Sequence, residues 1–176
     1  MLGPSVMSRY FTIFIVTILN SASQGWGKDH FGPDASYQVV MKEVQVPLVD
    51  FATCQDQLRA TPRLPRQFKL HSSFTCAGGE AGQDACRGDG GGPLVCAENV
   101  EGEEERYTQV GIVAWGIGCG EENVPGVYTD VAGQVCWIDW TMACQQGYGD
   151  RHVLFNGPEC NAWLEEKQNH RVKPLR

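Results

Sequence analysis

The segment Asp84-Ala-Cys-Arg-Gly-Asp-Gly-Gly-Gly-Pro-Leu-Val-Cys96 decides how the rest of this chain is interpreted. Glycine accepts positive φ without strain, so the glycine-rich run from Gly78 to Gly92 predicts a series of tight turns. The apolar residues from Pro93 to Cys96 predict a buried strand directly after them. This is not a phosphate-binding loop, because no Gly-Lys-Ser or Gly-Lys-Thr follows the glycines. The segment therefore predicts a structured loop that leads into the core of a β domain.

Further strands and two helices are predicted around this loop. Short runs rich in β-branched and aromatic residues, separated by turn residues, favour a small β-barrel or sandwich. Strands are predicted over residues 37–46, 93–96, 107–115 and 126–131, and a loop with Ser72-Ser73 is predicted to lead to Phe74–Cys76. Asp50 is a good cap for a short helix with Phe51, Cys54 and Leu58 on one face. A second helix is predicted over 134–144, with Val135, Ile138 and Met142 on one stripe.

Composition and charge limit the class of protein. The chain has 176 residues, which suits one domain or part of a larger one. Its 42% hydrophobic and 20% charged residues argue against intrinsic disorder. A net charge of -7 disfavours nucleic acid and acidic partners in general, because binding phosphate needs a basic face. The glutamates at 98, 101 and 103–105 predict a solvated hairpin tip, since a calcium loop needs spaced carboxylates and a sharp glycine turn.

The N-terminus and the cysteines indicate an oxidising compartment. Arg9 precedes the apolar run Phe11–Leu19, and the small residues Ser21–Ser23 follow it, which is the layout of a signal peptide. A buried strand is the alternative, and the run is too short for a transmembrane helix, which needs about 20 residues. We expect the mature chain to begin near Gln24 or Gly25. The eight cysteines lack paired C-x-x-C spacing, so disulfides are favoured and no metal site is expected.

The glycine-rich segment closely resembles the signature of the trypsin-like serine proteases, Gly-Asp-Ser-Gly-Gly-Pro. The resemblance continues in family order and spacing. It includes Gly25-Trp26-Gly27, Cys54, Cys76, Trp115-Gly116, Cys119, Pro125-Gly-Val-Tyr128 and Trp137-Ile138. Within the family, two segments are similar to the sequences of invertebrate clip-domain serine protease homologues. They are Gly-Trp-Gly-Lys-Asp-His-Phe-Gly at 25–32 and Gly-Cys-Gly-Glu-Glu-Asn at 118–123. The resemblance implies an all-β trypsin-like fold, mainly the second, C-terminal six-stranded β-barrel, with a C-terminal helix.

The catalytic residues of that family are missing. Gly90 occupies the position of the nucleophilic serine and has no side chain to attack a carbonyl. The family's histidine and aspartate lie in Ala-Ala-His-Cys and Asp-Ile-Ala-Leu settings, and neither motif occurs in this sequence. The histidines present are predicted to lie at the surface: His30, His71, His152 and His170. Losing even one member of the triad costs about four to six orders of magnitude in rate. We therefore expect no catalytic residue and no enzymatic activity.

The binding half of the family's site is retained by resemblance. Asp84 matches the aspartate at the base of the primary specificity pocket, and Gly116 and Gly126 match the glycines of its walls. This pattern suits a cationic side chain. Gly88 and Gly90 match the donors of the oxyanion hole. Asp89 matches the aspartate that receives the new N-terminal ammonium of a cleaved zymogen, and because no such sequence is present we expect its carboxylate to be unpaired.

The resemblance also implies two disulfides, Cys54 with Cys76 and Cys86 with Cys119. In the family, the partner of Cys96 lies upstream of the Gly-Trp-Gly motif, in a segment that the signal-like sequence replaces here. Cys96, Cys136, Cys144 and Cys160 are then left to pair among themselves or with another chain.

These observations lead to one main interpretation. We expect a signal peptide over residues 1–23, a partial trypsin-like domain over 24–144 and a C-terminal tail over 145–176. The resemblance implies a secreted, non-catalytic homologue that acts as a cofactor or regulator in an extracellular proteolytic cascade of innate immunity, of the prophenoloxidase activation type. Its partners would be extracellular proteins such as cascade proteases or prophenoloxidase, with no nucleic acid, membrane or cofactor. The alternatives are a trypsin-like serine endopeptidase and a truncated gene product without a function of its own.

Overall fold

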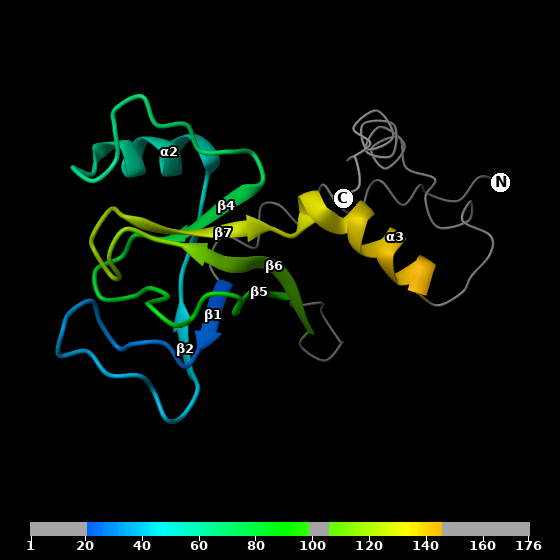
Figure 1. The fold of residues 1–176 in the computed structure, drawn as a ribbon, viewed down its shortest axis with the longest axis horizontal. Helices are drawn as coiled ribbons and strands as arrows, with labels where there is room; N and C mark the ends of the chain where they lie inside the picture. The colour runs from blue at the N-terminus through cyan, green and yellow to red at the C-terminus, as the bar shows by residue number, and fades with distance from the viewer. Residues whose placement is uncertain (1–20, 99–105, 146–176) are drawn as a thin grey trace, which may run out of the picture. The chain divides into compact units, whose positions relative to one another are not determined.

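The computed structural model describes residues 21–98 and 106–145 and divides into two compact units. The described part of the first unit, Met1–Val131, holds an antiparallel sheet and the helix α2, and the second unit is Ala132–Arg176 (Figure 1). The elements of the first unit are β1 (Ser21–Gly25), β2 (Lys42–Gln45), β3 (Leu48–Val49), α2 (Phe51–Ala60), β4 (Phe74–Gly78), β5 (Pro93–Glu98), β6 (Arg106–Trp115) and β7 (Pro125–Asp130).

The sheet of the first unit closes on itself. Its strand order is β2-β1-β5-β6-β7-β4-β3, so β2 and β3 are the outer strands. Only Val46 and Pro47 separate these two strands in the chain. Val46 donates its N–H to the Ser21 carbonyl (2.9 Å), and the Pro47 carbonyl accepts from Gly78 N–H (2.8 Å). Residues 42–49 therefore act as one bent strand that bonds to both ends of the sheet, and counted in this way the barrel has the six strands that the resemblance implies.

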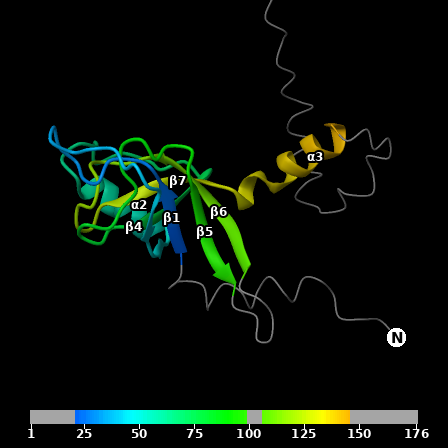
Figure 2. The same ribbon diagram turned by 90° about the horizontal axis from the view of Figure 1, so that it is seen from below.

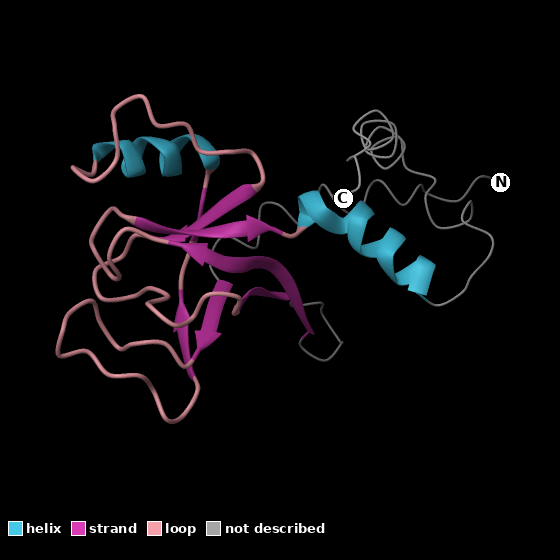
Figure 3. Ribbon diagram, in the orientation of Figure 1, coloured by secondary structure: helices cyan, strands magenta, loops and turns pink. Residues whose placement is uncertain are grey.

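Two apolar clusters lie on opposite faces of this sheet. Val46, Ala77, Leu94 and Tyr128 are fully buried on the inner face. On the outer face, α2 packs against β4 and β7 through a second cluster that comprises Cys54, Leu58, Leu70, Cys76 and Val127. Neighbouring residues of one strand belong to different clusters because successive side chains of a strand point to opposite faces. Figure 3 shows α2 as the helix on this outer face.

The first helix forms as its sequence pattern predicts. Asp50 is the N-cap, and its carboxylate accepts a hydrogen bond from Thr53 N–H (3.0 Å). Cys54 and Leu58 are buried, whereas Phe51, the first residue of the helix, stays 43% exposed. Cys54 is bonded to Cys76, which ties α2 to β4.

The predicted strands are confirmed over most of their length, with one clear difference. Of residues 37–46, only Lys42–Gln45 form a strand, and residues 37–41 belong to the long loop that joins β1 to β2. Val39 is 95% exposed there, so its β-branched side chain has no packed surface to fit. Gln38 N–H donates instead to the Trp26 carbonyl (3.2 Å), which holds the loop back on itself.

The barrel begins earlier than the sequence pattern suggests. Ser21–Ser23, which we predicted to lie at the end of a signal peptide, are buried in β1 and pair with β5 (Figure 2). The Ser21 hydroxyl donates to the Val46 carbonyl, and Cys96 lies buried directly across from Ser21. The barrel therefore includes three residues upstream of our boundary at Gln24. Residues 1–20 lie outside the described part of the chain, and the signal peptide stays a prediction.

The second unit contains a short 3-10 helix, η2 (Ala132–Gln134), and α3 (Val135–Gln145). The predicted helix over 134–144 is therefore confirmed. Val135 and Met142 are 44% and 49% exposed, and Cys136 is disulfide-bonded. The predicted tail after Gln145, including Cys160, and the glutamates at 101 and 103–105 lie outside the described residues. Among the helices that are described, none is long and apolar enough to cross a membrane.

Candidate binding site

Five residues singled out in the sequence lie around one cavity of about 330 Å³ in the first unit. They are Asp84, Gly88, Gly90, Gly116 and Gly126. Two loops form the cavity, one between β4 and β5 and the other between β6 and β7. Aromatic residues complete its wall, namely Phe31, Trp115 and Tyr128.

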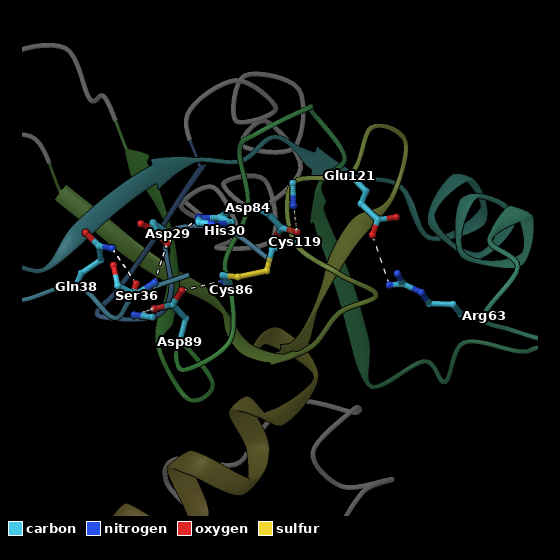
Figure 4. Close-up of a disulfide and its surroundings, with 12 residues drawn as sticks. Asp29, His30, Ser36, Gln38, Arg63, Asp84, Cys86, Asp89, Cys119 and Glu121 are labelled. Carbon is cyan, nitrogen blue, oxygen red and sulfur yellow. Dashed lines mark hydrogen bonds and ion pairs between the residues drawn. A yellow bond between two sulfur atoms is a disulfide. The ribbon is translucent and has the colours of Figure 1, made fainter. Parts of the chain in front are cut away.

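Covalent and hydrogen bonds join the two loops. Cys86 is bonded to Cys119, the second pair that the resemblance implies (Figure 4). Gly82 N–H donates to the Gly120 carbonyl (2.9 Å), and Val113 N–H donates to the Gly92 carbonyl (2.9 Å). The loop after β4 is thus attached both to the neighbouring loop and to strand β6, so the cavity is held open by backbone contacts.

Asp84 is the acidic residue that lines the cavity, and Arg87 is the basic one. One carboxylate oxygen, Oδ2, accepts a hydrogen bond from Gly120 N–H (3.1 Å). The other, Oδ1, is buried and has no hydrogen-bond partner among the described residues. Burial raises the pKa of Asp84 to about 6, and the charge of Asp89 adds to the shift. An added Cβ at Gly126 would lie 3.0 Å from Oδ1, so glycine at this position leaves room for the carboxylate.

Tyr128 supplies a polar group that sequence reasoning missed. Its hydroxyl is buried without a hydrogen-bond partner in the described part of the chain. Burial raises the pKa of Tyr128, and the nearby charge of Asp84 raises it further, so the hydroxyl keeps its proton at physiological pH. Alternation along β7 could have shown that Tyr128 faces inward, but it does not show which loop residue it meets.

Phe31 was missed for a different reason. It lies in the long loop between β1 and β2, and it reaches the cavity although more than 50 residues separate it from Asp84 in the sequence. Its side chain is 60% exposed, so it forms part of the rim. No local pattern in the sequence indicates this contact.

Gly90, which the resemblance assigns to the nucleophile position, is surrounded by open space. An added Cβ at this position would have no heavy atom within 4 Å, so a serine would fit without a clash. The N–H groups of Gly88 and Gly90 donate to no acceptor among the described residues. Gly88 needs to be glycine, because its φ is 107° and a Cβ would lie 2.7 Å from Tyr37 Cε1.

Asp89 does not have the unpaired carboxylate that we expected. Its Oδ1 accepts a hydrogen bond from Gly27 N–H (2.6 Å), and its Oδ2 accepts one from Cys86 N–H (2.8 Å). Gly25 and Gly27 make this possible, because a Cβ on either would collide with the carboxylate. The expectation was wrong because it considered only an ammonium partner, whereas backbone N–H groups also satisfy a carboxylate.

The described histidines are not among the residues that line the cavity. Its described lining contains no histidine, serine or threonine, and both of its cysteines are in a disulfide. His30 lies on a surface loop between Asp29 and Asp34, and His71 bonds to Ser73. His152 and His170 lie outside the described residues. Within residues 21–98 and 106–145, no group of side chains has the composition of a metal site.

Comparisons with known proteins place this site in context. The family model described as Trypsin matches residues 20–138. Phenoloxidase-activating factor 2 of Galleria mellonella is 63% identical over 121 residues, which cover 69% of this chain and 39% of that protein. Inactive CLIP domain-containing serine protease A3 of Aedes aegypti is 53% identical over 120 residues, 68% of this chain and 24% of that protein. Coagulation factor XII of Cavia porcellus is 45% identical over 115 residues, 65% of this chain and 18% of that protein. The chain thus spans well under half the length of these relatives.

Proposed function

This chain belongs to the trypsin family of serine proteases, and we propose that it acts as a secreted, non-catalytic member that regulates an extracellular proteolytic cascade of innate immunity. The observation that carries the proposal is a cavity in which the charged group for a basic side chain is present while the nucleophile position is Gly90. The names of two similar proteins, a phenoloxidase-activating factor and an inactive protease, support a role without catalysis.

The proposed ligand of the cavity is an arginine or lysine side chain of a cascade protein. Asp84 Oδ1 is buried without a partner, and a cationic donor would satisfy it with a charge-assisted hydrogen bond. The N–H groups of Gly88 and Gly90 would then hold the carbonyl oxygen next to that residue, as in an oxyanion hole. Without a nucleophile or a general base the bound peptide bond stays intact, so the chain holds its partner without cleaving it.

An arginine-mimicking aromatic amidine tests the pocket. We expect the wild-type chain to bind it weakly at pH 7.5, with binding that declines as the pH falls through about 6, because Asp84 becomes protonated. Isothermal titration calorimetry measures both effects. Asp84→Ala should abolish binding, and Glu121→Gln, which removes a carboxylate of the neighbouring loop, serves as the matched control. Equal affinities of the wild type and Asp84→Ala would remove Asp84 from the site.

The second test concerns catalysis. Gly90→Ser restores the hydroxyl in a position with room for it, but it adds no general base. We expect no hydrolysis of an arginyl amide by this variant above the uncatalysed rate, together with unchanged amidine binding. Measurable amidase activity of Gly90→Ser would overturn the non-catalytic assignment.

A further inference from the structure

The last turn of α2 and the segment that follows it carry a concentration of positive charge that the proposed function does not use. Four of the chain's 14 lysines and arginines lie within residues 59–69, at Arg59, Arg63, Arg66 and Lys69. No aspartate or glutamate occurs between Asp56 and Glu80. In a chain with a net charge of -7, this segment, hereafter the basic loop (residues 59–70), is a local reversal of sign.

The basic loop is anchored to the barrel from its inner side. The ring of Phe68 packs edge-on against Trp115, with centroids 6.1 Å apart. Arg59 Nε donates to the Phe68 carbonyl (2.6 Å), and Phe68 N–H donates to the Pro65 carbonyl (2.9 Å). Leu70 is buried, and its N–H donates to Gln55 Oε1 (3.1 Å). Because these contacts already order the loop, the loop loses little conformational entropy when a ligand binds to it.

The remaining cations of the loop lie at the surface. Arg63 is half-exposed and pairs with Glu121 (3.4 Å; Figure 4). Its guanidinium lies 5.6 Å from the ring centre of Phe31. Arg66 and Lys69 are exposed, and neither has a carboxylate within ion-pair distance in the described part of the chain. The anchored loop therefore presents two cations without a described carboxylate partner, Arg66 and Lys69. Arg63 and the ring of Phe31 form a second exposed contact surface.

We propose that the basic loop is a docking surface for an acidic polypeptide segment of a partner protein. Carboxylates already bind at two of its arginines, Arg59 with Asp56 at 3.3 Å and Arg63 with Glu121 at 3.4 Å. The exposed ring of Phe31 offers an apolar contact that a peptide side chain uses and a uniformly sulfated glycan does not. The overall negative charge of the chain repels an acidic segment elsewhere, so binding of such a segment is favoured at the basic loop.

The test measures binding of a fluorescein-labelled glutamate-rich peptide to the full chain by anisotropy. We expect binding to weaken as salt is raised from low to physiological concentration, because exposed charges are screened. The double variant Arg66→Gln/Lys69→Gln should bind roughly tenfold more weakly, as expected for two exposed ion pairs. Arg66→Lys/Lys69→Arg keeps both charges and should retain the wild-type affinity.

A matched control separates the loop from net charge. Lys28→Gln/Lys42→Gln removes the same number of charges from another part of the barrel and should leave peptide affinity unchanged. Equal losses in the two double variants would overturn the proposal, as would failure of the wild type to bind the peptide. A sulfated oligosaccharide that binds the wild type while the peptide does not would identify a glycan as the occupant instead. Amidine binding at Asp84 is measured in the same samples, so failure of this proposal and failure of the proposed function are distinguishable.

Discussion

Two aspartates of the same loop meet different environments only five residues apart. Asp89 has both carboxylate oxygens bonded to backbone N–H groups, from Gly27 and Cys86. Asp84 has one bonded oxygen and one buried oxygen without a described partner. The first carboxylate stabilises the loop, because its charge is compensated, whereas the second costs stability for as long as no cation satisfies it.

Asp84→Asn should therefore stabilise the chain at neutral pH. The pKa of Asp84 is about 6 in the folded chain and near 3.8 ordinarily, so the folded state binds this proton more tightly. The free energy of unfolding then falls as the pH rises between these values and stays low above them. Removing the charge should restore about 1–3 kcal/mol at pH 7.5, with no gain at pH 3, as measured by urea unfolding at both pH values.

Asp89→Asn is the matched control for this prediction. One of its two side-chain polar atoms becomes an NH₂ donor that faces a backbone N–H, so a hydrogen bond is lost and a donor is left unpaired. We expect the free energy of unfolding to fall by about 1–3 kcal/mol at pH 7.5, opposite in sign to Asp84→Asn. A gain in stability for both variants would contradict the contrast between the two sites.

At the scale of elements, local sequence patterns predict those helices and strands whose formation depends on a few neighbouring residues. The helix after Asp50 and strands β5 to β7 follow from a cap, from β-branched runs and from glycine turns, all of which act over a few residues. The pattern failed in two places. Residues 37–41 have strand-forming side chains but no surface to cover, and Ser21–Ser23 have small polar side chains that become a strand only because β5 and β2 lie on either side.

The two described disulfides with known partners should differ in what their removal changes. Cys54–Cys76 joins α2 to β4 and closes a loop with a sequence separation of 22, whereas Cys86–Cys119 has a separation of 33 and lies in the cavity wall. Cys54→Ala/Cys76→Ala should lose about 3 kcal/mol of unfolding free energy in the chain-entropy model. It should keep amidine affinity at temperatures where it is folded.

Cys86→Ala/Cys119→Ala should lose a similar amount of stability and also lose amidine binding, because the two loops around Asp84 are no longer joined. Thermal unfolding and calorimetric titration of both double variants give the comparison. Loss of binding in the Cys54→Ala/Cys76→Ala variant, while it remains folded, would show that the cavity depends on the outer cluster as well.

At the scale of the whole molecule, the candidate site depends on segments that are distant in the chain. Asp84 and its neighbouring glycines could be assigned from one motif, since a motif carries its own spacing. Phe31 at the rim, Tyr128 beside the carboxylate and the bonds from Gly27 to Asp89 could not, because they exist only once the barrel has closed. The basic loop is visible in the sequence as charge, but its anchoring by Phe68 and Trp115 is not.

Strand β1 should be essential for folding of the barrel. It pairs with both β2 and β5, and Ser21, Ala22 and Ser23 are buried in it. We expect a variant that begins at Ser21 to show the same cooperative thermal transition, followed by near-ultraviolet circular dichroism, as the full chain. A variant that begins at Trp26 should show no cooperative transition, because two neighbouring strands lose their hydrogen-bond partner. A cooperative transition in the Trp26 variant would show that the remaining strands close without β1.

The bent strand over residues 42–49 has a consequence for solubility. An open sheet presents a row of unpaired N–H and C=O groups at each side, and another chain's strand can add there and start aggregation. Here both outer positions of the described sheet belong to one continuous segment that bonds to β1 on one side and β4 on the other. The described barrel thus carries, within its own sequence, protection against edge-to-edge assembly.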